Sequence, residues 1–188
     1  MSLADNQTFH QKDFAHESLN FTEFEDCSFE GCNFSTVDLG HCSFISCTFI
    51  DCEFSMTLLG RTAFQDVHFE GCKLLGLYFN DCNPLLLSLN FTNCHVKVCS
   101  FEGLRLPKTM FLNCDLSEAD FNGVGLKESS FEGTRLERCL FDGADLEGAD
   151  FRQAIDFTLD PEIVNLKGAR FSKCNLEGLL KRYDLDIE

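Results

Sequence analysis

Cysteines are the residues of this chain whose type and spacing could do chemistry. The 188-residue sequence contains 12 of them, and five lie in the stretch CSFEGCNFSTVDLGHCSFISCTFIDCEF, residues 27–54. Four converging cysteines would bind zinc or an iron–sulfur cluster, and suitably placed pairs would form disulfides. Isolated buried cysteines fill a core as small apolar residues. Choosing among these readings requires the elements that position the cysteines.

The chain repeats every five residues. From Phe9 to Phe79 every fifth residue is Phe or Leu, and a second register of Phe, Leu and Val runs from Phe91 to Phe151 and returns at positions 166, 171 and 176. A period of five fits neither an α-helix nor a long strand. It predicts a solenoid whose chain turns a corner every five residues and points one large apolar residue inward on each side.

The number of sides per coil follows from the Leu positions. In the first register Leu19, Leu39 and Leu59 recur every twenty residues, and in the second register Phe and Leu alternate from 101 to 151. Coils of four pentapeptides stack both patterns into columns of a single residue type, whereas coils of three would mix them. The sequence therefore predicts a four-sided solenoid of about eight coils over residues 9–178, after a leader at 1–8.

Three pentapeptides carry a family resemblance. ADFNG, ADLEG and ADFRQ, which start at Ala119, Ala144 and Ala149, resemble the A(D/N)LXX consensus of the pentapeptide-repeat family. The resemblance extends over roughly residues 7–178. It implies a right-handed quadrilateral β-helix.

Composition limits where and on what the protein acts. The N-terminus has no signal-peptide pattern and no apolar run approaches a membrane-spanning length, so we expect a cytoplasmic protein. The net charge of −16 argues against direct binding to nucleic acid or to an anionic membrane. No catalytic motif is present, and a lumen filled with Phe and Leu leaves no interior pocket, so we expect no enzymatic activity.

Eleven of the 12 cysteines lie two residues before a member of the inward columns, where the side chain is usually small, and Cys82 keeps the five-residue phase before Pro84. The C-x4-C spacing places them on successive sides of a coil, where they do not converge. We therefore predict core-filling cysteines, with no metal and no cofactor. Cysteines twenty apart, such as Cys27 and Cys47, lie within bridging distance at a coil spacing of about 4.8 Å. A reducing cytoplasm favours free thiols.

The repeat is interrupted twice. Twelve residues instead of ten separate Phe79 from Phe91, which predicts a kink or small loop over residues 80–90. This break is either a packing kink, which we favour, or a partner-contacting protrusion formed by Pro84, Leu85, Leu86 and Leu87. The second interruption is a non-repeat insert at residues 154–165, where Asp156 and Pro161 occupy inward column positions.

The C-terminal residues 179–188 are predicted to form a short helix and an extended tail. An open β-helix end needs a cap, and the same apolar side chains could join two copies. The predicted cap and homodimer interface consists of Leu179, Leu180, Tyr183, Leu185 and Ile187.

The segment FTLDPEIVNLKGARFS, residues 157–172, and the final LLKRYDLDIE resemble the C-terminal segment of Qnr-type quinolone-resistance proteins. In that group the segment joins two β-helices end to end, and members bind DNA gyrase or topoisomerase IV by imitating duplex DNA. This chain departs from the pattern at Leu159, and it lacks the long projecting loops of plasmid-borne members. The resemblance therefore implies the fold and the dimer more strongly than drug protection.

The acidity is consistent with such mimicry. About eight coils at about 4.8 Å form a rod of about 40 Å, and DNA of that length carries about 24 negative charges. Two functions stay open: an acidic DNA mimic that binds a type II topoisomerase, or an interaction scaffold with another protein partner. The candidate acidic surface comprises Glu30, Asp51, Asp66, Glu70, Asp115, Asp120, Asp142 and Asp145.

Overall fold

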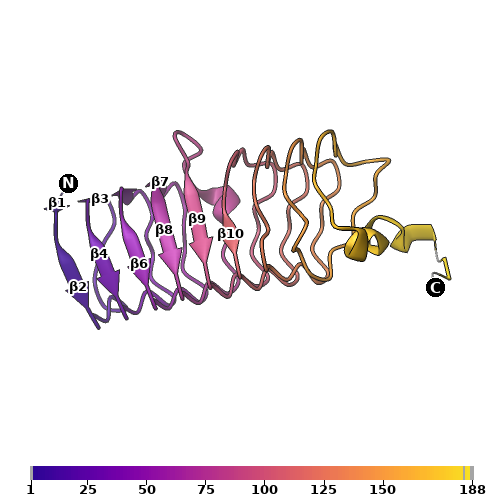
Figure 1. The fold of residues 1–188 in the computed structure, drawn as a ribbon. Helices are drawn as coiled ribbons and strands as arrows, with labels where there is room; N and C mark the ends of the chain where they lie inside the picture. Colours follow the sequence, from indigo (N-terminus) through magenta and orange to yellow (C-terminus); the bar gives the residue numbers. More distant parts are fainter. Residues whose placement is uncertain (1, 184, 187–188) are drawn as a thin grey trace.

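The protein is an all-β solenoid with a little 3-10 helix. The computed structural model describes residues 2–183 and 185–186. Figure 1 shows successive turns stacked along one axis, from the N-terminus in indigo to the C-terminal helices in yellow. Among the described residues, no helix is long and apolar enough to cross a bilayer.

Short strands form two parallel sheets. One sheet has the order β1-β3-β5-β7, with bounds Ser2–Asp5, Thr22–Glu25, Ser43–Ile45 and Ala63–Gln65. The other has the order β10-β9-β8-β6-β4-β2, so it spans six successive turns. From β2 to β10 its strands are Thr8–His10, Ser28–Glu30, Thr48–Ile50, Val67–Glu70, Leu89–Thr92 and Phe111–Leu112.

Residues twenty apart lie side by side in neighbouring turns. Phe9 pairs with Phe29 and Phe29 with Phe49, and single bridges continue this offset as far as Asp150 with Arg170. Across the break the offset becomes twenty-two, as in Phe69 with Phe91. The stacking period and the two extra residues predicted from the sequence are thus both present.

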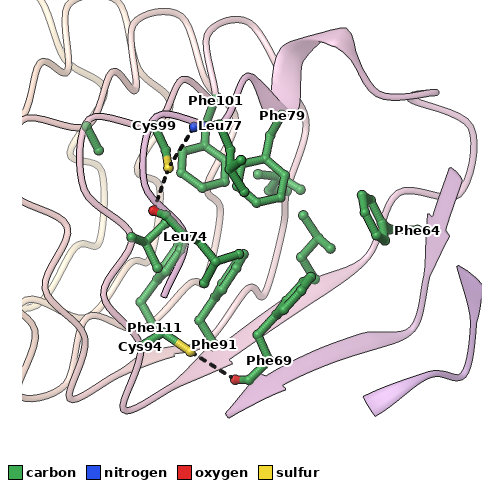
Figure 2. Packing of buried hydrophobic residues seen from close by; sticks show 14 of the residues in the cluster. Phe64, Phe69, Leu74, Leu77, Phe79, Phe91, Cys94, Cys99, Phe101 and Phe111 are labelled. Atoms are coloured by element: carbon green, nitrogen blue, oxygen red, sulfur yellow. Dashed lines mark hydrogen bonds between the residues drawn. The ribbon is translucent and has the colours of Figure 1, made fainter. Parts of the chain in front are cut away.

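Stacked aromatic rings fill the solenoid (Figure 2). Phe49 is fully buried between Phe29 and Phe69, with ring centroids 4.7 and 5.0 Å away and nearly parallel planes. Rings on adjacent sides of a turn meet edge to face, as Phe49 and Phe54 do at 5.1 Å and 83°. Both geometries are favoured for aromatic pairs, because each brings the positive ring edge near a negative face.

The chain bends two residues after most inward residues. There φ is positive, for example +50° at Asp26, +62° at Gly31 and +61° at Thr36. This left-handed conformation costs a non-glycine residue roughly 1–2 kcal/mol, and glycine adopts it without that penalty. The recurrence of the bend every five residues explains why the sequence period is five.

Three boundaries differ from the prediction. Strand β1 lies within residues 1–8, expected to be a leader, and pairs with β3, so the solenoid begins earlier. At the insert, Phe157 replaces Asp156 as the buried residue and packs edge to face on Phe151 at 5.5 Å. The helix η2 (Lys173–Leu179) begins inside the expected repeat and leaves Leu176 exposed. Two further 3-10 helices are η1 (Phe79–Asp81) and η3 (Lys181–Tyr183).

Candidate partner-binding surfaces

The cysteines belong to the core and to the bonding between turns. Eleven of the 12 free thiols are buried, and only Cys174 is exposed. The Sγ atom of Cys42 donates to the carbonyl oxygen of Leu19 in the preceding turn at 2.9 Å, and Cys52 donates to Phe29 at 3.3 Å. Figure 2 shows the same bond from Cys94 to Phe69 and from Cys99 to Leu74.

Elsewhere in the core, threonine hydroxyl groups also donate a hydrogen bond to a carbonyl oxygen of the preceding turn. Thr62 Oγ1 donates to the carbonyl oxygen of Leu39 at 2.8 Å, and Thr134 Oγ1 donates to that of Phe111 at 2.9 Å. The position two before an inward residue thus takes a small side chain that also links the turns. Among the described residues, no group of three or more His, Cys, Asp or Glu side chains is arranged to hold a metal ion.

Burial keeps Cys42, Cys47 and Cys139 protonated. It raises the pKa of Cys42 to about 11 and those of Cys47 and Cys139 to about 12, because a thiolate loses its hydration in the core. A protonated thiol is a hydrogen-bond donor and a poor nucleophile. The buried cysteines are therefore suited to packing and to bonding between turns.

The eight predicted acidic residues fall into two groups. Three lie beside a basic side chain: Glu30 is 3.0 Å from His10, Asp115 2.7 Å from Lys97 and Asp145 3.3 Å from Lys127. Hydrogen bonds from Lys97 and Ser117 outweigh partial desolvation and hold the pKa of Asp115 below its usual value. No ion pair with another described residue involves the remaining five: Asp51, Asp66, Glu70, Asp120 and Asp142.

Charge is distributed unequally along the solenoid. Residues 1–94 contain 13 Asp and Glu against 3 Lys and Arg, a net charge of −10, whereas residues 95–188 contain 18 against 12, a net charge of −6. Of the fifteen ion-pair contacts between described residues, twelve lie within residues 97–182. The uncompensated negative field therefore belongs mainly to the N-terminal half.

Within that half, three exposed carboxylates gather around one strand. Asp66 and Glu70 lie at the two ends of β8, and the backbone N–H of Asp51 in the preceding turn donates to the carbonyl oxygen of Glu70 at 2.8 Å. We call Asp51, Asp66 and Glu70 the N-terminal acidic face. The paired Asp115 and Asp145 lie in later turns and are not part of this face.

The break at residues 80–90 forms a loop that projects before β9 (Figure 1). Leu85 and Leu86 are about two-thirds exposed, while Leu87 is buried against the core. The loop begins at η1 and includes the exposed Pro84. The predicted leucines are thus divided: Leu87 anchors the loop, and Leu85 and Leu86 face outward.

The C-terminal helix η2 covers the end of the aromatic column. Gly178 lies so close to Phe157 that a Cβ at that position would be 2.3 Å from the ring, and the N–H of Leu159 donates to its carbonyl at 3.0 Å. The side chain of Asn175 donates to the carbonyl oxygen of Phe151 at 2.8 Å. These contacts leave no room for a further turn of solenoid.

Apolar side chains remain exposed beyond this helix. Leu179 is half-buried, whereas Leu180, Tyr183 and Leu185 are 36%, 46% and 56% exposed, and Ile187 lies outside the described residues. Arg182 pairs with Asp160 and, at 3.2 Å, with Glu162, which holds η3 against the insert. Of the predicted dimer residues, Leu180, Tyr183 and Leu185 are therefore accessible at this end of the described chain.

One surface feature was missed by sequence reasoning. A shallow groove of about 580 Å³ crosses the N-terminal turns and is lined by Phe21, His41, Leu58, Tyr78 and the carboxylates Asp38 and Asp81, among others. Phe21 is 56% exposed and stacks on His41 at 4.7 Å. The sequence feature that could have pointed to this groove is that Phe21 is one of only two phenylalanines outside the inward columns.

Comparison of the sequence with known protein families agrees with the repeat architecture described above. The family described as "Pentapeptide repeat region" matches residues 22–84 and 78–151, most of the chain. The chain belongs to the pentapeptide-repeat family. A search of curated proteins returned no match to this member of the family.

Two solved structures, both of QnrB1, show the same fold. A trypsin-treated variant of QnrB1, a plasmid-mediated fluoroquinolone resistance protein, aligns over 100% of both chains with 19% identity and a TM-score of 0.57. A second trypsin-treated QnrB1 variant aligns over 100% of this chain and 99% of that chain, with 20% identity and a TM-score of 0.52. HetL from the cyanobacterium Nostoc sp. strain PCC 7120 covers 91% of this chain and 85% of its own, with 16% identity and a TM-score of 0.47.

Proposed function

We propose that this pentapeptide-repeat protein binds the DNA-binding surface of a type II topoisomerase, DNA gyrase or topoisomerase IV, in place of DNA. Binding would modulate the enzyme or protect it from quinolones, and the protein itself would be a non-enzymatic cytoplasmic partner. The observation that carries the proposal is the N-terminal acidic face, in which Asp51, Asp66 and Glu70 are exposed without basic partners. A surface that binds DNA is basic, and an uncompensated acidic rod is complementary to it.

The proposal includes a finer geometry for the rod. We infer a right-handed, four-sided coil of about eight turns, since crossovers between parallel strands are right-handed in nearly all proteins. The twenty-residue register with an inward residue every five supports four sides. We also infer a homodimer through Leu180, Tyr183, Leu185 and their neighbours, because a two-fold pairing would bury this apolar end and double the length of the acidic rod.

The deciding experiment is a gyrase supercoiling assay with and without a fluoroquinolone. We expect the purified protein to inhibit supercoiling or to relieve the drug, and the triple variant Asp51→Asn, Asp66→Asn, Glu70→Gln to weaken this effect about tenfold or more. The matched control is Glu118→Gln, Glu128→Gln, Glu137→Gln, which removes the same charge from carboxylates that lie near Arg138, Lys108 and Arg135. Equal loss in both variants, or no effect of the protein on gyrase and topoisomerase IV, would refute the proposal.

A second candidate is an interaction scaffold with a different protein partner and no role in drug resistance. It is favoured by the exposed apolar groove around Phe21 and Tyr78, a feature that charge mimicry does not require. Recovery of a partner other than a topoisomerase, lost on substitution in this groove and kept in the triple acidic variant, would support the scaffold.

A further inference from the structure

The groove of the N-terminal turns is lined by both apolar and acidic residues. Phe21, Leu58 and Tyr78 are each more than half exposed within it, and Phe21 and His41 present two stacked rings. Exposed aromatic side chains that line a concavity are typical of binding sites. Asp38 and Asp81 supply carboxylates to the same concavity.

Two glycines keep the groove open. Gly40 and Gly60 occupy equivalent positions in successive turns and both line it. A Cβ added at Gly60 would meet no atom within 4 Å, and neither glycine has a positive φ. At Gly40 a Cβ would lie 2.9 Å from Oδ1 of Asp38, so that position needs glycine for space, whereas at Gly60 neither space nor backbone conformation requires it.

The carboxylates of the groove lack a cation. Asp38 accepts a hydrogen bond from the N–H of Gly40 at 2.8 Å, and among the described residues neither Asp38 nor Asp81 forms an ion pair. Arg61 stands in the same column as His41 and Asp81, but it is not among the lining residues. The groove therefore presents aromatic faces and negative charge together, in the half of the chain with a net charge of −10.

We propose that this groove binds an arginine side chain of a partner protein. A guanidinium is planar and weakly hydrated, so it stacks on aromatic rings while donating hydrogen bonds to carboxylates. An apolar side chain would leave the two carboxylates unused, and a lysine ammonium would stack less favourably on Phe21 and Tyr78. The assignment concerns the chemistry of the contact and holds whichever protein supplies the arginine.

The test is an NMR titration of the labelled full-length protein with the peptide acetyl-Gly-Arg-Gly-Arg-Gly-amide. We expect shift changes concentrated at Phe21, His41 and Tyr78, with dissociation constants on the order of 1 mM for so small a ligand. The same peptide with citrulline in place of arginine keeps the shape and loses the charge. It should bind at least about tenfold more weakly, a difference of about 1.4 kcal/mol.

Three variants locate the site. Gly60→Leu should fill the groove and abolish the changes at Tyr78, and the pair Asp38→Asn, Asp81→Asn should weaken binding by about tenfold. The control pair Asp66→Asn, Glu70→Gln removes the same charge elsewhere and should leave the changes in place. The proposal is overturned if the changes spread over the whole acidic surface, if citrulline binds equally well, if Gly60→Leu binds normally, or if about 10 mM peptide has no effect.

Discussion

At the scale of the residue, each turn depends on a pair of positions: a large inward side chain and a small one two residues before it. The large residue stacks on its counterparts in the turns above and below, as Phe49 does on Phe29 and Phe69. The small residue fits beside it and often donates to a carbonyl of the preceding turn, as Cys52 and Thr62 do. Cysteine is common at this position because its thiol meets both demands in a small volume.

Replacing an inward ring tests this packing. Phe49→Ala should lower the free energy of unfolding by about 3–5 kcal/mol, because the rings of Phe29 and Phe69 cannot close the cavity it leaves. A urea denaturation curve measures the change. Leu140→Ala, at a side chain that is 53% exposed and has no positive φ, is the control and should change stability little. An unchanged midpoint for Phe49→Ala would show that this column does not carry the core.

Buried thiols also make stability dependent on alkaline pH. The folded pKa values of Cys42 and Cys47 are raised to about 11 and about 12, from an ordinary value of 9.0. Below pH 9 these thiols are protonated in both the folded and the unfolded chain, so their burial contributes its full share to the free energy of unfolding. Between pH 9 and about 11 the unfolded chain releases their protons and the folded chain does not, so the free energy of unfolding falls.

Each such thiol should contribute a slope of about 1.4 kcal/mol per pH unit in that window. Urea denaturation at several pH values measures the slope. Cys47→Ala should reduce this slope by about 1.4 kcal/mol per pH unit, the contribution of one thiol. An identical slope in wild type and variant would show that Cys47 ionises equally in both states.

At the scale of the element, the two ends of the solenoid are handled differently. Strand β1 starts the N-terminal sheet directly, whereas the C-terminal end is covered by η2 through Gly178, Phe157 and Asn175. An uncovered end would expose aromatic core and unpaired backbone groups. The capping contacts come from residues up to Leu179, and the exposed apolar side chains come after them, so capping and dimerisation can be separated experimentally.

Two changes at this end should give different outcomes. If the protein pairs through this end, Leu180→Glu with Leu185→Glu should give a monomer that still folds, because the substituted side chains lie outside the cap. Deletion of residues 177–188 removes Gly178 as well and should also destabilise or precipitate the protein. Analytical ultracentrifugation and thermal unfolding measure the two effects. A dimer that persists in the double variant would exclude this interface.

At the scale of the whole molecule, the solenoid is a rod with unequal electrostatic halves. The C-terminal half crosslinks its turns with ion pairs such as Lys127 with Glu147 at 2.8 Å, where hydrogen bonds from Lys127 and Lys167 lower the pKa of Glu147. The N-terminal half relies on its phenylalanine columns and leaves its carboxylates to solvent. A basic partner would therefore be attracted chiefly to the N-terminal half.

Salt should reveal this asymmetry. If the N-terminal acidic face makes the contact, affinity for the topoisomerase should fall steeply as ionic strength rises, since exposed charges are screened beyond a Debye length of about 8 Å at 0.15 M. Affinity measured over a salt series should lose much of its slope in the triple variant Asp51→Asn, Asp66→Asn, Glu70→Gln. A salt-independent affinity would instead point to the apolar groove.

Sequence alone determined the inward columns, the twenty-residue register and the role of the small residues. These features are periodic and local, because a Phe or Leu every five residues predicts where the chain bends and which side chains are buried. Even the ion pair of Lys127 with Glu147 follows from the register, since the two residues are twenty apart. The phase change at Phe157 does not, because Asp156 stands at the expected spacing and only the burial of the ring decides between them.

The tertiary structure decided which acidic residues are available and where the surface is hollowed. Lys97 neutralises Asp115 from eighteen residues away, an offset that the repeat does not specify. The groove exists because Gly40 and Gly60 stack in successive turns beside Phe21 and Tyr78, which come from different sides of the repeat pattern. A period records what each turn shares with the next, whereas a binding surface arises from side chains that differ between turns and meet only once the turns are stacked.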